Sequence, residues 1–316
     1  MNDKLILLTT LVILLTGLTV FFVFTTPDFG FIFGDSGAGL IQSAFSEELS
    51  REPIAVSAIE PNYFPIRNFN IADPEVNATA AGIYDNRSNR FLYAKNIDSR
   101  LPIASITKLM SAVVVMEKLD LDRIVTVTVE NINVDGNGAD LYRDEKLYVS
   151  DLLKMMLIRS SNDAALTIAA RAKEKGVDFV FEMNKKAMEL GMTDTHFNDP
   201  AGLSDDAFST VADLVKLLNY STKYDKIWSA LSTQKAEVFS IDGKISHNFA
   251  NTNTLLGELP EVVGGKTGFT DGAKGTMVLL ITHENSELIS IILGSDDRFG
   301  ETKKIISWAK EVHKWR

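Results

Sequence analysis

The chain has no cysteine, only four histidines and fewer basic than acidic residues, and each shortage excludes a class of function. Without cysteine it has no disulfide scaffold, no thiol nucleophile and no thiolate zinc site. The histidines lack the spacing of metal ligands, so we expect no metal site; they are His196, His247, His283 and His313. Lys and Arg total 32 against 42 Asp and Glu, and this net charge of −10 argues against nucleic-acid binding.

One long hydrophobic run stands at the N-terminus. From Leu5 to Phe24 no side chain is charged, and twenty helical residues span about 30 Å, the thickness of a bilayer core. We expect a membrane segment or signal over residues 1–26. Lys4 precedes the run and acidic residues follow it, so the positive-inside rule places the rest of the chain outside the cytoplasm. An uncleaved anchor is favoured, because the candidate cleavage site at 36–38 lies far beyond the run.

Residues 27–70 mix Gly, Ser, Pro and acidic residues without periodicity, which predicts a linker. They contain Gly-Asp-Ser-Gly at 34–37, a string found around the nucleophile of chymotrypsin-like proteases. Those enzymes place a histidine before that serine, and none precedes Ser36 here. The segment is therefore interpreted as a tether to a domain spanning residues 71–316.

Within this domain, alternating strand patterns lie near both ends and helical patterns lie between them. Residues 79–84 and 90–93 predict one hairpin, and 276–282 with 287–293 predict another. Helical spacing covers 105–119, 149–172, 177–190, 210–220 and 299–315. The sequence therefore predicts an α+β fold in which early and late segments complete one sheet.

Three short motifs follow one another in this domain: Ser105 to Lys108 (Ser-x-x-Lys), Ser160-Ser161-Asn162 and Lys266-Thr267-Gly268. Ser-x-x-Lys also occurs at 232–235 and 307–310, but only the first copy has both other motifs downstream. That ordered triple is the signature of class A β-lactamases and penicillin-binding proteins.

The first motif suits an activated hydroxyl. On a helix, residues three apart lie about 60° apart around the axis and one turn apart in height, so the Lys108 amine can reach Ser105. No histidine stands at a motif position, which leaves Lys108 as the candidate base. Its pKa must then fall by about three units from about 10.4, or roughly 4 kcal/mol. Lys266 and partial burial are expected to supply that shift.

From about residue 70 onward the chain resembles the bacterial serine D-alanyl-D-alanine carboxypeptidases, the low-mass penicillin-binding proteins of the β-lactamase-like superfamily. The matching strings are LYAKN, PIASITKLM, SSNDAA, THFNDPAGL, STVADL, NTN and GGKTGFT. The resemblance implies an antiparallel sheet flanked by helices, a helical subdomain, and a site between the two. Many relatives have Gly in place of Ser161, and many carry a β-rich C-terminal domain with a membrane-binding helix. Here the N-terminal segment is expected to provide the anchor.

The resemblance also implies roles for the motif residues. Ser105 would form an acyl-enzyme, Ser160 would pass a proton to the departing D-alanine nitrogen, and Asn162 would hold the substrate's backbone amide. The backbone N–H groups of Ser105 and Phe269 would form the oxyanion hole.

The third motif would recognise the end of the substrate. Lys266 and Thr267 would meet its terminal carboxylate, and Gly268 would let the substrate's backbone approach the strand. Arg298 is a weaker candidate for the same carboxylate, since it has Asp296 and Asp297 as neighbours with which to pair.

These roles predict a serine carboxypeptidase that removes the terminal D-alanine from peptidoglycan stem pentapeptides, needs no cofactor or metal, and is inhibited by β-lactam antibiotics. We expect a single-pass protein of the bacterial cell membrane with its catalytic domain outside the cytoplasm. The alternatives are a DD-endopeptidase or transpeptidase acting on wall cross-links, a β-lactamase, and a catalytically silent penicillin- or wall-binding module. The β-lactamase is disfavoured because the stretch 195–204 offers Asp199 but no glutamate to activate water. The silent module is disfavoured because every catalytic position is filled.

Overall fold

The computed structural model describes residues 65–132 and 141–315. The expected anchor at 1–26 and almost all of the expected linker at 27–70 lie outside these ranges. Among the helices that the two ranges contain, none is both long and apolar enough to cross a bilayer.

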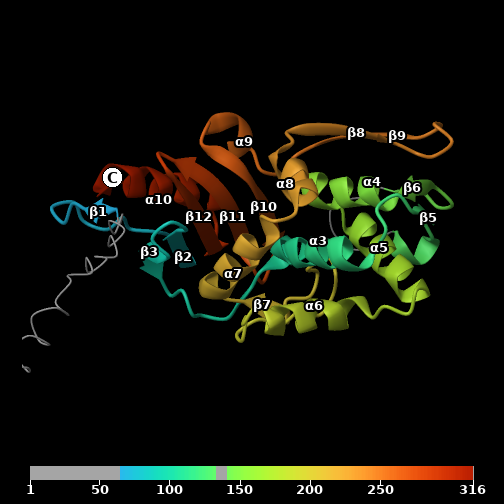
Figure 1. Ribbon diagram of the computed structural model, residues 1–316, viewed down its shortest axis with the longest axis horizontal. Coiled ribbons are helices and arrows are strands. Elements are labelled where there is room, and N and C mark those ends of the chain that lie inside the picture. The colour runs from blue at the N-terminus through green and yellow to red at the C-terminus, as the bar shows by residue number, and fades with distance from the viewer. Residues whose placement is uncertain (1–64, 133–140, 316) are drawn as a thin grey trace, which may run out of the picture. The chain divides into compact units, whose positions relative to one another are not determined.

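A five-stranded antiparallel sheet forms one part of the domain (Figure 1). Its order is β10-β11-β12-β2-β3, so strands from the two ends of the domain lie side by side, as the sequence predicts. Both predicted hairpins are confirmed, by β2 with β3 and by β11 with β12. The strands are β2 (Ala78–Asp85), β3 (Arg90–Lys95), β10 (Val262–Thr270), β11 (Lys274–His283) and β12 (Ser286–Ser295).

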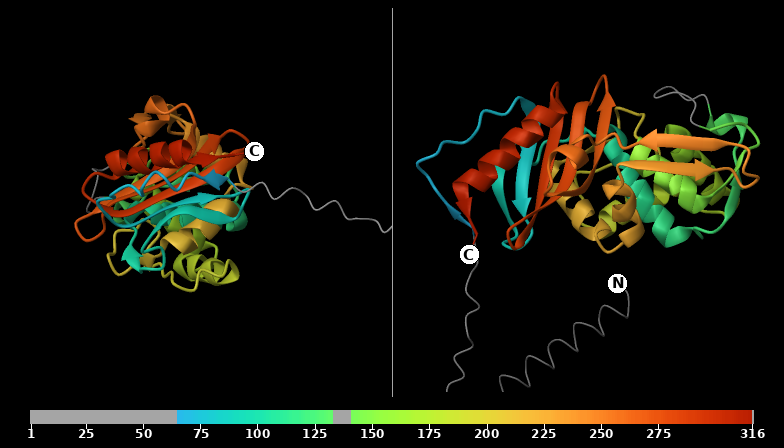
Figure 2. Two further views of the ribbon diagram at one scale, coloured as in Figure 1. Left: turned by 90° about the vertical axis from the view of Figure 1, so that its left-hand side faces the viewer. Right: turned by 90° about the horizontal axis from the view of Figure 1, so that it is seen from above.

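Each face of the sheet buries its own apolar cluster, because successive strand residues point to opposite sides. On β11, Val278 and Leu280 belong to the core shared with the central helices. Met277 and Leu279 belong instead to a second core with α10 (Arg298–Val312). Figure 2 shows α10 on one face of the sheet and most of the other helices on the opposite face. Helix α10 ends three residues earlier than the predicted helix 299–315. The next two residues, His313–Lys314, form strand β13, which pairs with β1 (Ile66–Arg67).

Helix α3 (Thr107–Lys118) lies at the centre of the helical part, and its residues from Thr107 to Val115 are all buried. The other helices of this part are α4 (Val149–Lys154), α5 (Asn162–Glu174), α6 (Phe179–Glu189), α7 (Val211–Ser221) and α8 (Asp225–Ser232). The short helix α9 (Leu255–Glu258) lies instead beside β10 and packs Leu255 into the core of α10. Short helical turns are η1 (Ala104–Ile106), η2 (Val129–Asn131) and η3 (Met155–Arg159). Two-stranded ladders join β4 (Leu101–Pro102) to β7 (Phe208–Ser209), β5 (Ile124–Thr126) to β6 (Lys146–Tyr148), and β8 (Lys235–Phe239) to β9 (Ser246–Ala250).

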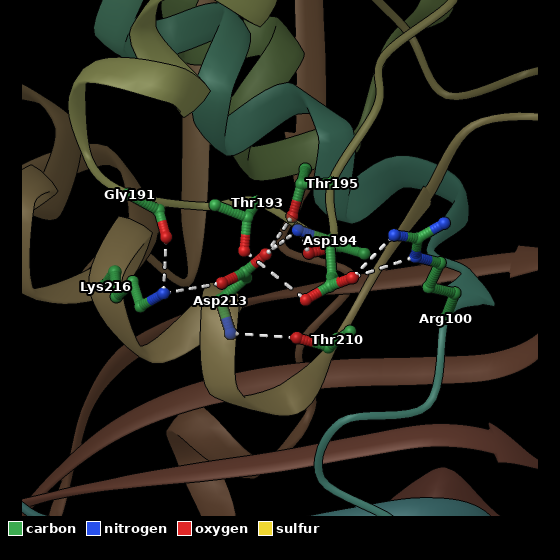
Figure 3. A network of polar contacts seen from close by, with 9 residues as sticks. Arg100, Gly191, Thr193, Asp194, Thr195, Thr210, Asp213 and Lys216 are labelled. Carbon is green, nitrogen blue, oxygen red and sulfur yellow. Dashed lines mark hydrogen bonds and ion pairs between the residues drawn. The ribbon is translucent and has the colours of Figure 1, made fainter.

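A polar network fixes the start of the loop that joins α6 to α7 (Figure 3). The buried Asp213 carboxylate accepts from the Asp194 N–H and the Thr195 hydroxyl, each at 2.9 Å, and from Lys216 Nζ at 2.8 Å. Asp194 in turn accepts from Arg100 at 2.7 Å. The loop is thus attached to α7 before it runs on through residues 196–204 toward α3.

Candidate active site

The predicted nucleophile and base are in contact. Ser105 lies in the 3₁₀ turn η1 that leads into α3, and Lys108 Nζ is 2.8 Å from its Oγ. Ala104, directly before Ser105, has φ +48, a left-handed conformation that is uncommon for alanine. Such backbone strain is held by the surrounding structure and is typical of functional sites. The first motif therefore forms the predicted hydroxyl–amine pair.

Lys108 also contacts two oxygen atoms outside the first motif. Its fully buried Nζ is 2.7 Å from Asn162 Oδ1 and 2.7 Å from the Ala201 carbonyl oxygen. Both of these oxygens are acceptors, so Lys108 donates to them and is held by them in a fixed orientation beside Ser105. The same Nζ also donates to the Ser105 hydroxyl.

Ala201 is a site residue that the sequence analysis missed, because it acts through its main chain. It belongs to the turn 199–204, in which Asp199 accepts from the backbone N–H groups of Ala201, Gly202, Leu203 and Ser204 at 2.6 to 3.2 Å. The Pro200 carbonyl accepts from Ser111 on α3 at 2.6 Å. The Asp-Pro-x-Gly string was the available signal for such a turn.

Ser160 owes its position to an irregular helix. Helix α4 runs into the π-helical turn η3, and Ser160 ends that turn with φ +67. π-helical turns of this kind often occur at functional sites. The Ser160 hydroxyl accepts from Lys266 Nζ at 2.8 Å, which joins the second motif to the third.

Ser161, which replaces the glycine of many relatives, fits without strain. Its φ is −57, a value open to any residue, and its hydroxyl accepts from the Ala164 N–H at 3.1 Å. It is the N-cap of α5, whose first residue is Asn162. This departure from the family pattern therefore leaves the second motif intact.

Strand β10 carries the third motif and was not among the strands predicted by alternation. Lys266 is only 1% exposed. Burial lowers the pKa of Lys266 well below its usual range, and the nearby charges of Lys108 and Arg298 lower it further. The two buried amines therefore oppose each other's protonation.

Gly268 lets the chain itself pack closely. A Cβ at this position would lie 2.8 Å from the Ser105 backbone nitrogen and 3.0 Å from Ala104 Cβ. The sequence analysis expected a glycine here to leave room for the substrate. The structure adds a second reason: β10 and η1 come this close only because residue 268 has no side chain. The close approach places the start of the Phe269 main chain beside the nucleophile, while the Phe269 side chain is 58% exposed.

Two further predicted residues are Thr267, on strand β10, and Arg298, on α10. The hydroxyl of the buried Thr267 contacts that of Thr252 at 2.7 Å. Arg298 begins α10, forms no ion pair with Asp296 or Asp297 in the described part of the chain, and has a buried Nε without a hydrogen-bond partner. Asp297 instead caps α10 by accepting from the Gly300 N–H at 2.8 Å.

One site therefore gathers Ser105, Lys108, Ser160, Asn162 and Lys266 through direct contacts. It combines an activated hydroxyl, a second hydroxyl on a buried amine, and positive charge. In the described ranges no group of three or more His, Cys, Asp or Glu residues could hold a metal ion.

The sequence matches a known family over most of the described domain. The family model described as D-alanyl-D-alanine carboxypeptidase, Peptidase_S11, matches residues 67–297. The carboxypeptidase DacF of Bacillus subtilis is 30% identical over 241 residues, which cover 73% of this chain and 62% of that protein. The D-alanyl-D-alanine endopeptidase of Escherichia coli is 30% identical over 243 residues, which cover 75% of this chain and 78% of that protein.

Solved structures show the same fold. A D-alanyl-D-alanine carboxypeptidase of Mycobacterium tuberculosis has a TM-score of 0.71 at 25% identity, covering 78% of this chain and 96% of that one. Penicillin-binding protein D2 of Listeria monocytogenes, in a cefotaxime-bound form, has a TM-score of 0.65 at 31% identity, covering 76% and 99%.

Proposed function

The chain belongs to the D-alanyl-D-alanine carboxypeptidase family, and on that premise we propose that it removes the terminal D-alanine from peptidoglycan stem pentapeptides. The observation that carries the proposal is the contact of Lys108 with Ser105, Asn162 and the Ala201 carbonyl. This arrangement supplies a nucleophile and a base without histidine.

The reaction follows from these contacts. Lys108 takes the Ser105 proton as Oγ attacks the carbonyl carbon between the two D-alanines. The oxyanion meets the backbone N–H groups of Ser105 and Phe269. As the C–N bond breaks, Ser160 gives its proton to the departing nitrogen and regains one from Lys266, which contacts it. Water then attacks the ester: its oxygen joins the acyl carbon, Lys108 returns its proton to Ser105 Oγ, and the proton that water releases restores Lys266.

Positive charge near β10 supports recognition of a terminal carboxylate by Lys266, Thr267 and Arg298. Arg298 is suited to this because its guanidinium is not paired with a carboxylate of the described chain. A planar guanidinium binds a carboxylate through two parallel hydrogen bonds. Asn162 is proposed to hold the substrate's backbone amide while its Oδ1 orients Lys108.

A β-lactamase reading is disfavoured by Asp199. Both of its oxygens accept from the backbone of its own turn, so its carboxylate is committed to the loop and is not presented to a water. We propose that β-lactams instead acylate Ser105, as compounds that share the substrate's carboxylate. The cefotaxime-bound Listeria relative supports this.

The apolar run Leu5–Phe24 supports a membrane location. We propose that residues 1–26 anchor the protein in the bacterial cell membrane, that residues 27–70 form a tether, and that the catalytic domain lies outside the cytoplasm.

The test incubates the full-length protein with a stem pentapeptide ending in D-Ala-D-Ala, with a cross-linked muropeptide dimer and with fluorescent penicillin. Release of D-alanine from the pentapeptide, lost in Ser105→Ala, is expected. Cleavage of the dimer alone would identify an endopeptidase, as for the E. coli relative. Labelling without any cleavage would identify a silent binder, and rapid penicillin turnover a β-lactamase.

A further inference from the structure

Arg298 keeps a positive charge beside the site without a carboxylate partner in the described chain. Its pKa is lowered by burial, and its Nε is enclosed without an acceptor. The adjacent Asp297 is already used as the helix cap. A long, flexible arginine with unused donors needs another support if it is to hold one orientation.

Part of that support is a glycine on β11. A Cβ on Gly275 would lie 3.2 Å from Arg298 Cβ and 3.4 Å from its Cδ, so the arginine stem lies over this glycine. Gly275 pairs with Phe269 in the neighbouring strand β10. The stem therefore crosses the sheet one strand away from the third motif, and the Arg298 charge acts on the Lys266 pKa from there.

The guanidinium itself rests on an aromatic ring. Arg298 Cζ lies 4.8 Å from the centroid of the Phe299 ring. Phe299 is partly buried and packs on the core between α10 and the sheet, so its ring is held in place. A ring attracts the cation through its π face and consumes none of the N–H donors, whereas a carboxylate would occupy them.

We propose that Phe299 is a positioning residue, which holds the Arg298 guanidinium in the orientation that receives the substrate's terminal carboxylate. The proposal deepens the carboxypeptidase function and rests on it. Phe299 acts only through Arg298, so its effect is confined to substrates that carry the carboxylate.

The test compares two peptides in full-length protein, one ending in D-Ala-D-Ala and one ending in D-Ala-D-alaninamide. In Phe299→Leu we expect KM for the carboxylate peptide to rise about fivefold with kcat within about twofold, the size of a partly buried cation–π contact. The value of kcat/KM for the amide should stay unchanged. Phe299→Tyr, which keeps the ring, should restore the KM of the wild type.

Phe91→Leu is the matched control, because Phe91 is also partly buried and its ring contacts Tyr84, at 5.1 Å, far in sequence from Arg298. It should leave the ratio of the two kcat/KM values unchanged. Equal losses on both peptides in Phe299→Leu would show a merely structural role and overturn the proposal, as would an unchanged ratio.

If wild-type protein released no D-alanine, the proposed function would fail on its own. The same comparison then uses acylation of Ser105 by penicillin and by its methyl ester. A selective loss with the free acid supports the role of Phe299, and an equal effect on both overturns it.

Discussion

Lys108 and Lys266 are two amines enclosed in one site, each at most 1% exposed. A buried ammonium loses its hydration, and a second one nearby adds repulsion. The hydrogen bonds distribute the tasks: Lys108 holds the nucleophile, and Lys266 holds Ser160. The proposed catalysis thus uses a pair of groups whose burial is unfavourable for folding.

The free energy of unfolding should depend on pH because Lys266 is buried. The pKa of Lys266 is lowered in the folded state, so the unfolded state binds more protons wherever pH lies between that value and about 10.4. Stability therefore rises with pH through this window. Lys266→Met, which removes the titrating group, should flatten the rise, as measured by urea denaturation from pH 6 to pH 9.5. Lys235→Met, at an exposed position, is the control; parallel curves for wild type and Lys266→Met would contradict the prediction.

The turn 199–204 is the element that orients Lys108, the proposed base. Four of its backbone N–H groups converge on Asp199, and its carbonyl groups at Pro200 and Ala201 reach Ser111 and Lys108 on α3. The main chain of this loop therefore takes part in the site, although its side chains do not.

Asp199→Asn should damage both stability and acylation. The amide group would place N–H donors against backbone N–H groups that now have an acceptor, and losing hydrogen bonds to a charged group costs about 1.5–3 kcal/mol. Urea denaturation and the rate of labelling by fluorescent penicillin measure the two effects. Asp206→Asn, on the exposed neighbour, should change neither. Normal labelling by Asp199→Asn would show that the turn does not aim Lys108.

The same turn contains a glycine that serves packing as well as conformation. Gly202 has φ +75, and a Cβ there would lie 2.0 Å from the Ala104 carbonyl oxygen. Gly191, shortly after the end of α6, has φ +68 and nothing within 4 Å of a Cβ. Gly191→Ala should cost about 1 kcal/mol of stability, the left-handed penalty alone. Gly202→Ala should cost several times more, and similar costs in urea denaturation would show that the loop is free to move away from η1.

At the scale of the molecule, the site exists only where three distant parts of the chain meet. The edge strand β10 lies against η1, and the junction of η3 with α5 contacts β10 through Ser160 and α3 through Asn162. The sheet fixes Lys266, and the helical part fixes Lys108. The site therefore forms only when the sheet and the helical part are both folded.

The sequence predicted the side chains of the candidate site better than the main chain around them. The order of the three motifs singled out Ser105, Lys108 and Lys266, because the chemistry of a side chain follows from its residue type. Strand β10 was not predicted from alternation, since Gly264 and Gly265 give it no period-two pattern. The Ala201 carbonyl was also missed, because every residue has one and only the fold selects which is used.

The proposed anchor gives a prediction for the full chain. Leu15→Arg places a charge at the middle of the apolar run, which costs about 3 kcal/mol of insertion free energy. The share of protein in the membrane fraction of cells should fall, as measured by immunoblotting after fractionation. Ala44→Arg, in the proposed tether, should have no effect. Equal membrane association of both variants would remove the basis for the anchor.

The pairing of β1 with β13 bears on how the domain can be engineered. Ile66 stands opposite Lys314 and Arg67 opposite His313, so the first and last strands of the described domain are adjacent. A short linker could join residues 66 and 314, and new termini could be opened at the exposed Asp242–Gly243 turn. Such a circular permutant would leave β10, η1 and η3 uncut. In the unpermuted chain, a reporter fused after β13 would instead lie beside β1, the first strand of the described domain.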